Sequence, residues 1–160
     1  HLMMYNPFDY IERFVEAGAD QLTFHLEATE EVEETLRFIR KCNVKAGLAL
    51  SPETSITLVT KYLEQCDMVL LMSVHPGFGG QSFIPEVLEK IKFTRDVCNK
   101  LHIQGENSTP FNIQVDGGID QKTAKLCFDA GANIFVAGTF LFKQPNLKTA
   151  VASLRHAAGG

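Results

Sequence analysis

Short runs of almost entirely apolar residues recur along the chain, and segments with helical spacing of their apolar residues separate them. The clearest run is Met68–Val74, which has no charged residue. A strand that is apolar at every position is buried on both faces, as in a parallel sheet covered by helices. Regular alternation of such strands with helices restricts the fold to two α/β architectures, an open doubly wound sheet or a (β/α)8 barrel.

The whole chain, residues 1–160, is expected to be a single domain, because no linker or shift in composition divides it. Ser51 is expected to cap one helix, with Pro52 at its first position, and Asp120 is expected to cap another. The polar segment Gln104–Pro110 is expected to be a flexible surface loop. The expected strands are 21–28, 44–50, 68–74, 111–115 and 133–138, and the expected helices are 6–19, 30–42, 51–65, 85–101, 121–132, 138–143 and 146–157.

The ends of three consecutive strands favour the barrel. These strands run into His75–Gln81, Asp116–Gly118 and Gly138–Thr139, all of which contain glycine. Glycines at one sheet edge let backbone N–H groups approach an anion. Barrel enzymes often build a phosphate site from the loops after strands 7 and 8 and a short extra helix. Counting back from these strands makes the chain an incomplete barrel, with strands 4 to 8 and the tail of strand 3 at residues 1–5.

Composition excludes several function classes. The formal net charge is −4 and the chain has no basic run, so neither nucleic acid nor an anionic membrane surface is an expected partner. No apolar stretch is long enough to span a bilayer. The widely spaced Cys42, Cys66, Cys98 and Cys127 indicate reduced thiols in a cytoplasmic protein, and neither a disulfide framework nor a zinc site.

The segments HLMMYNP, GADQLTFHLEA, VKAGLAL, LMSVHPGFGGQSF, VDGGI and GANIFVAGT, in this order, resemble the ribulose-phosphate 3-epimerase family. The resemblance covers nearly the whole chain and implies a (β/α)8 TIM barrel of the ribulose-phosphate-binding type. It implies a cytoplasmic enzyme of the pentose phosphate pathway that interconverts D-ribulose 5-phosphate and D-xylulose 5-phosphate by inverting C3. The implied cofactor is a divalent metal ion, Zn, Fe, Mn or Co.

The resemblance also implies roles for particular residues. Asp116 is implied as a catalytic acid/base and a metal ligand, and His1 as a metal ligand that also meets the substrate. Met3 and Met72 are implied to line the reacting face. The substrate phosphate is implied to sit on the backbone of Gly77, Phe78, Gly79, Gly80, Gly117, Gly118, Gly138 and Thr139.

The chemistry explains these residue types. Inverting a carbon beside a ketone needs a base on one face and an acid on the other, with an enediolate between them, which a divalent cation stabilises. In the family the second catalytic Asp, a second metal-binding His and a substrate-binding Ser come from strands that precede His1. The chain alone is therefore expected to be inactive, and the full-length protein active.

Three alternatives remain open. They are an epimerase acting on allulose 6-phosphate, another barrel enzyme with the same phosphate site, such as a tryptophan-pathway lyase or synthase, and a non-catalytic phosphate-binding fragment. His25 is expected to pack at a strand end, where it and Glu27 could border the pocket. An incomplete barrel exposes sheet edges, so a homo-oligomer, or pairing with another chain, is expected.

Overall fold

The computed structural model describes residues 1–160 and contains one five-stranded sheet. All neighbouring strands are parallel, and their order in the sheet is their order in the chain. The strands are β1 (Gln21–His25), β2 (Lys45–Leu50), β3 (Met68–Met72), β4 (Asn112–Asp116) and β5 (Ile134–Val136).

Helices connect these strands and follow the last one. The α-helices are α1 (Ile11–Glu16), α2 (Val32–Lys41), α3 (Val87–Lys100), α4 (Gln121–Ala130), α5 (Thr139–Phe142) and α6 (Leu147–Ala157). The 3-10 helices are η1 (Pro7–Tyr10), η2 (Leu26–Ala28), η3 (Ile56–Gln65) and η4 (Glu106–Ser108). None of these helices is both long and apolar enough to cross a bilayer.

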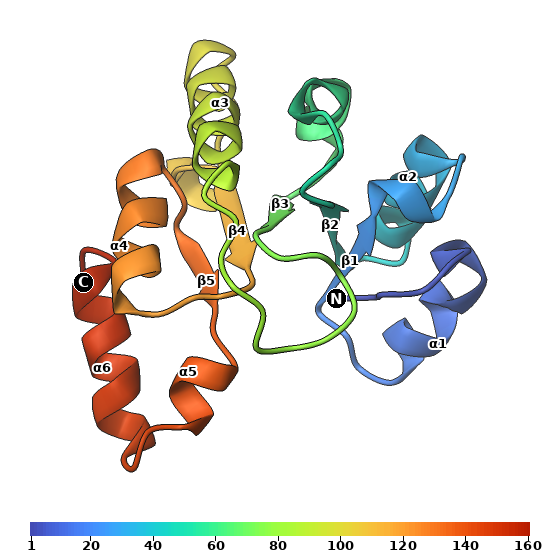
Figure 1. Cartoon of the computed structure of the whole chain (residues 1–160). Helices are drawn as coiled ribbons and strands as arrows, with labels where there is room; N and C mark the ends of the chain where they lie inside the picture. Colours follow the sequence, from blue (N-terminus) through green and yellow to red (C-terminus); the bar gives the residue numbers. More distant parts are fainter.

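The sequential strand order distinguishes the two architectures that the sequence left open. A doubly wound sheet reverses its strand order at a switch point, whereas a barrel wall adds each strand beside the previous one. No reversal occurs here. Figure 1 shows the helices arranged in an arc along the outside of the strands. The fold is therefore a parallel α/β sheet wound as in a barrel.

The wall extends by one short segment beyond β1. Leu2 pairs with Phe24 in a parallel bridge, and the Leu2 N–H donates to the Thr23 carbonyl over 2.8 Å. Residues 1–3 therefore run beside β1 in the position of a further parallel strand.

The two faces of the sheet carry cores of different size. The helix-facing core contains 28 buried residues, whereas the opposite face has a cluster of only five. Alternation along β3 explains the division: Val69 and Leu71 face the helices, whereas Leu70 and Met72 join the smaller cluster. The smaller cluster occupies the position of a barrel interior.

One local expectation is wrong. The helix expected over 51–65 begins only at Ile56 and is a 3-10 helix, with Ser55 and not Ser51 at its N-cap position. Residues 51–54 form a turn, in which the Ser51 carbonyl accepts the Thr54 N–H. The Ser51 N–H donates to Glu27.

The insert Gln104–Pro110 lies mostly at the surface, and its ends form an antiparallel bridge around η4.

Two other expectations are confirmed. Asp120 caps α4, since its carboxylate accepts from the Thr123 N–H while the Thr123 hydroxyl accepts from the Asp120 N–H. The short helix expected after the last strand is present as α5.

Candidate active site

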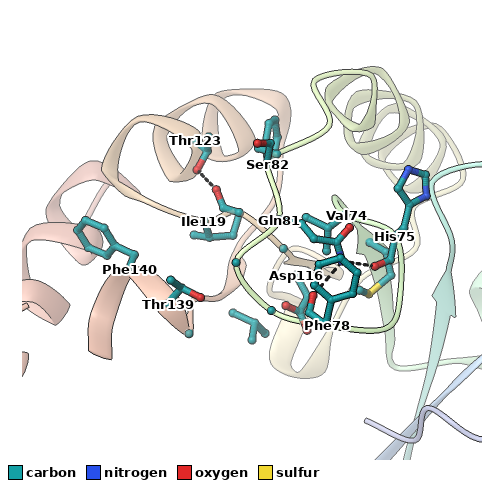
Figure 2. A pocket seen from close by; sticks show the side chains of 18 of the residues that line it. Val74, His75, Phe78, Gln81, Ser82, Asp116, Ile119, Thr123, Thr139 and Phe140 are labelled. Carbon is teal, nitrogen blue, oxygen red and sulfur yellow. Dashed lines mark hydrogen bonds between the residues drawn. The ribbon is translucent and has the colours of Figure 1, made fainter. Parts of the chain in front are cut away.

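A pocket of about 630 Å³ lies where β3, β4 and β5 end. The loop from β3 to α3 forms one wall, the turn from β4 to α4 forms the floor, and the start of α5 forms the opposite wall. Figure 2 shows Phe78 and Gln81 on the loop, and Thr139 and Phe140 on the α5 side. The pocket is lined by all the residues proposed from the sequence except His1, namely Met3, Met72, Gly77, Phe78, Gly79, Gly80, Asp116, Gly117, Gly118, Gly138 and Thr139.

Asp116 is the last residue of β4 and pairs in register with Met72 and Val136. Its side chain is 26 % exposed, and its carboxylate accepts no hydrogen bond from the protein. Burial raises the pKa of Asp116 above its usual value. Asp120 also lines the pocket, but its carboxylate is occupied as the cap of α4. Asp116 is therefore the pocket carboxylate available to take up or release a proton.

His1 does not line the pocket but lies beside Asp116. Its Nδ1 atom is 3.9 Å from Oδ2 of Asp116, and its side chain is 16 % exposed. The bridge between Leu2 and Phe24 holds the backbone that carries this imidazole. The structure thus brings together the two residues proposed as metal ligands, although they come from distant parts of the sheet.

The two methionines differ in exposure. Met3 is 55 % exposed and opens onto the pocket, whereas Met72 is 2 % exposed and belongs to the smaller core cluster. Both line the pocket, and a methionine side chain is flexible and polarisable.

The glycine backbone in this pocket has unused donors. None of the N–H groups of Gly77–Gly80, Gly117, Gly118 and Gly138 donates a hydrogen bond within the protein. The two sides of the pocket lie close together. A methyl group placed on Gly79 of the loop would lie 3.8 Å from the hydroxyl of Thr139 on the α5 side. Backbone N–H groups without protein partners, gathered in a pocket, suit an anionic ligand such as a phosphate.

The side chain of Gln81 holds the glycine loop in shape. Its amide nitrogen donates to the carbonyls of His75 (2.7 Å) and Phe78 (2.8 Å), and Figure 2 shows the three residues together on this loop. His75 also contacts Glu53, with 2.6 Å between Nδ1 and Oε1. The loop is therefore linked to the turn that follows β2.

His1 and Asp116 supply part of the set of ligands that a divalent transition metal needs. Zinc and its neighbours accept imidazole nitrogen and carboxylate oxygen, which are the atoms that His1 and Asp116 direct toward each other. No group of three or more His, Cys, Asp or Glu side chains is placed to hold a metal ion. These two residues therefore provide part of a site that usually takes three or four protein ligands.

Two residues near this pair have contacts that the sequence did not predict. His25 is 7 % exposed, and its Nε2 lies 2.9 Å from Nε2 of His1. Its Nδ1 lies 3.3 Å from Oε2 of Glu27. The only signal in the sequence is a His and a Glu two residues apart at a strand end, which alone does not indicate a contact with His1.

The sequence model of the ribulose-phosphate 3 epimerase family matches residues 1–142. The ribulose-phosphate 3-epimerase of Chlamydia pneumoniae is 50 % identical over 92 % of this chain, and that of Bacillus subtilis is 40 % identical over 97 %. The chain spans 62 % of the length of the first relative and 69 % of the second. It therefore corresponds to about three fifths of the first relative and about seven tenths of the second.

Solved structures with low identity share the fold. A crystal structure of 3-hexulose-6-phosphate synthase superposes with a TM-score of 0.68 at 19 % identity, over 96 % of this chain and 69 % of that one. A crystal structure of KGPDC from Streptococcus mutans gives a TM-score of 0.65 at 14 % identity, over 96 % of this chain and 67 % of that one.

Proposed function

Because the chain belongs to the ribulose-phosphate 3-epimerase family, we propose that the complete gene product interconverts D-ribulose 5-phosphate and D-xylulose 5-phosphate. The observation that carries this proposal is the position of Asp116. Its carboxylate accepts no hydrogen bond, stands beside His1, and opens onto a pocket lined by free backbone N–H groups.

Each part of the pocket has a role in this reaction. Asp116 takes the proton from C3 on one face of the substrate or returns it there, and its raised pKa brings it closer to the pH at which both steps are fast. The N–H groups of Gly79–Gly80, Gly117–Gly118 and Gly138–Thr139 hold the phosphate. Met3 and Met72 line the face near C3 without competing for the proton.

His1 and Asp116 are proposed as two of the ligands of a divalent metal ion. The metal, when bound, supplies positive charge where the carbonyl oxygen becomes negative. The residues of this chain then hold the substrate between the glycine loop and the end of β4, and exclude water from that space.

We further propose that β1 to β5 are strands 4 to 8 of a (β/α)8 barrel. Residues 1–3 run in parallel beside β1, and α5 lies between β5 and α6, where phosphate-binding barrels carry a short extra helix. The second acid/base and a second metal-binding His then belong to strand 2 of the complete protein, and a substrate-binding Ser to strand 1.

A cytoplasmic location and a homo-oligomeric state are also proposed. Four unpaired thiols, three of them buried, suit a reducing compartment. For residues 1–160 alone, the edge of β5 that pairs with no strand offers unpaired backbone groups to another chain.

The test is an assay of the purified complete gene product. D-ribulose 5-phosphate is added in D2O, and NMR follows the appearance of D-xylulose 5-phosphate and of deuterium at C3. Exchange at C3 with formation of product supports the proposal. If allulose 6-phosphate is converted with a higher kcat/KM than D-ribulose 5-phosphate, it is the substrate in place of that compound. If neither compound exchanges its hydrogen at C3, the proposed function is overturned.

A further inference from the structure

A line of polar contacts leads from Asp116 in the pocket to the end of β1. Asp116 faces His1, His1 contacts His25, and His25 contacts Glu27. We propose that His25 and Glu27 are positioning residues that fix which ring nitrogen of His1 carries the proton, so that Nδ1 is left unprotonated toward Asp116. This inference rests on the proposed function, because an unprotonated Nδ1 is what a metal ligand requires.

The two imidazole rings meet in a geometry that suits a hydrogen bond. Their Nε2 atoms are 2.9 Å apart, their centroids are 5.0 Å apart, and their planes differ by 25°. If the two rings were stacked face to face with their centroids 5.0 Å apart, their Nε2 atoms could not lie only 2.9 Å apart. The rings therefore touch edge to edge, nearly in one plane, with a single hydrogen between the two nitrogens.

Glu27 is held as a carboxylate by the turn after β2. Its Oε1 accepts the Ser51 N–H over 2.8 Å and also the Thr54 hydroxyl. Burial alone would raise its pKa, but the hydrogen bonds from His25, Thr54 and Ser51 together lower the pKa of Glu27 to about 2. Near neutral pH it can only accept hydrogen bonds.

Lys90 fixes the turn that holds Glu27. Its ammonium donates to the carbonyls of Pro52 and Thr54, the latter over 2.7 Å. The donors facing Oε1 of Glu27 are therefore held by contacts from α3 as well as by the turn itself. This fixed environment leaves Oε2 for His25.

The proton positions follow from these contacts. Because Glu27 only accepts, the hydrogen of His25 lies on Nδ1, which leaves a lone pair on Nε2 of neutral His25. That lone pair accepts the hydrogen on Nε2 of His1. Neutral His1 then has its own lone pair on Nδ1, the atom that lies 3.9 Å from Asp116. Histidines that ligate metals commonly donate their other N–H to such a partner.

The decisive variant is Glu27→Gln in the complete gene product. The amide oxygen is required by the Ser51 and Thr54 donors, so the NH2 group turns toward His25. His25 must then accept at Nδ1 and donate from Nε2, which moves the proton of His1 to Nδ1. The substitution changes no side-chain length, and the exposed Glu33→Gln is its matched control, since Glu33 pairs only with Lys61 on the outer surface.

Two measurements read the result. In the metal-free protein, long-range ¹H–¹⁵N NMR should find the proton of His1 on Nε2 in the native protein and in Glu33→Gln, and on Nδ1 in Glu27→Gln. The affinity for Co²⁺, measured by competition with a chelator, should fall about 10–100-fold in Glu27→Gln. Should Glu27→Gln fail to fold, His25→Phe keeps a ring of similar size, and the same loss of Co²⁺ affinity is expected.

The proposal is overturned if the proton of His1 stays on the same nitrogen in Glu27→Gln, or if Co²⁺ affinity remains within about two-fold of the native value, well short of the expected loss. The NMR result does not depend on catalysis. An inactive native protein would therefore refute the proposed function while the tautomer measurement still decides the role of His25 and Glu27.

Discussion

Nδ1 of His1 lies 3.9 Å from Oδ2 of Asp116, although their backbones stand at distant positions in the sheet. Residues 1–3 lie beside β1, and β2 and β3 separate β1 from β4. In a flat sheet these four strand spacings, of about 4.8 Å each, would put the two backbones roughly 19 Å apart. The sheet therefore curls strongly, so that side chains from strands far apart in the sheet order can meet.

The first prediction concerns Asp116. In the complete gene product, Asp116→Asn should lower kcat about 10²–10⁴-fold, because the amide can neither take the proton from C3 nor return it. Asp129→Asn is the control, since Asp129 is exposed on α4 and pairs with Lys125. The rate of epimerisation in both variants is the measurement. A loss of only a few-fold in Asp116→Asn would show that the role is wrongly assigned.

The second prediction concerns anion binding. Titration of the complete protein with inorganic phosphate should shift the amide NMR signals of Gly79–Gly80, Gly117–Gly118 and Gly138–Thr139. These three segments line the pocket, and the N–H groups of their glycines have no protein partners. Sulfate should compete for the same signals. Shifts confined to another part of the molecule would contradict the proposed phosphate position.

The third prediction compares two glycines at this edge. Gly118 has a φ of +62°, and a methyl group there would lie 2.7 Å from the backbone nitrogen of Phe83. Gly118→Ala should lower the free energy of unfolding by about 2–4 kcal/mol, from backbone strain and the clash together. Gly138→Ala meets no atom within 4 Å and should change it by less than about 0.5 kcal/mol. Urea denaturation measures both, and equal effects would refute the steric argument.

The fourth prediction concerns pH. The pKa of Glu27 falls from 4.5 to about 2 on folding, so its ionised form stabilises the fold. That contribution is fully present above pH 4.5 and is lost as the pH falls toward 2. The free energy of unfolding should therefore decline less steeply over this range in Glu27→Gln than in the native protein. Glu33→Gln should retain the native slope, and identical slopes in all three proteins would exclude this role of Glu27.

The fifth prediction concerns the chain of residues 1–160 expressed alone. β5 pairs only with β4, so its other edge offers unpaired backbone groups to another molecule. Size-exclusion chromatography with light scattering should therefore find self-association. A monodisperse monomer of 17.8 kDa would contradict this expectation.

The strands were predictable because burial on both faces leaves apolar residues at almost every position, as in β3. The position of Asp116 at the end of a strand was predictable as well, since all strands of a parallel sheet end at the same edge. The helix expected from Ser51 was wrong for a physical reason. Residues 51–54 close into a turn, and Glu27 accepts from both the Ser51 N–H and the Thr54 hydroxyl. No local pattern reveals these contacts with a residue in another connection.

The contacts of His25 were missed for a related reason. Its position at the end of β1 and a neighbouring strand tail at residues 1–5 were both expected, but its hydrogen bond to His1 depends on the register between residues 1–3 and β1. The spacing of residues along the chain does not give that register.

Gln81 has a consequence for the entropy of ligand binding. Ordering a flexible backbone costs about 1–2 kcal/mol of conformational entropy for each residue. Because Gln81 already links the carbonyls of His75 and Phe78, the glycine loop has lost much of that freedom before a ligand arrives. More of the contact energy between this loop and a ligand then remains as affinity. Gln81 therefore acts on binding strength from a position where it need not touch the ligand.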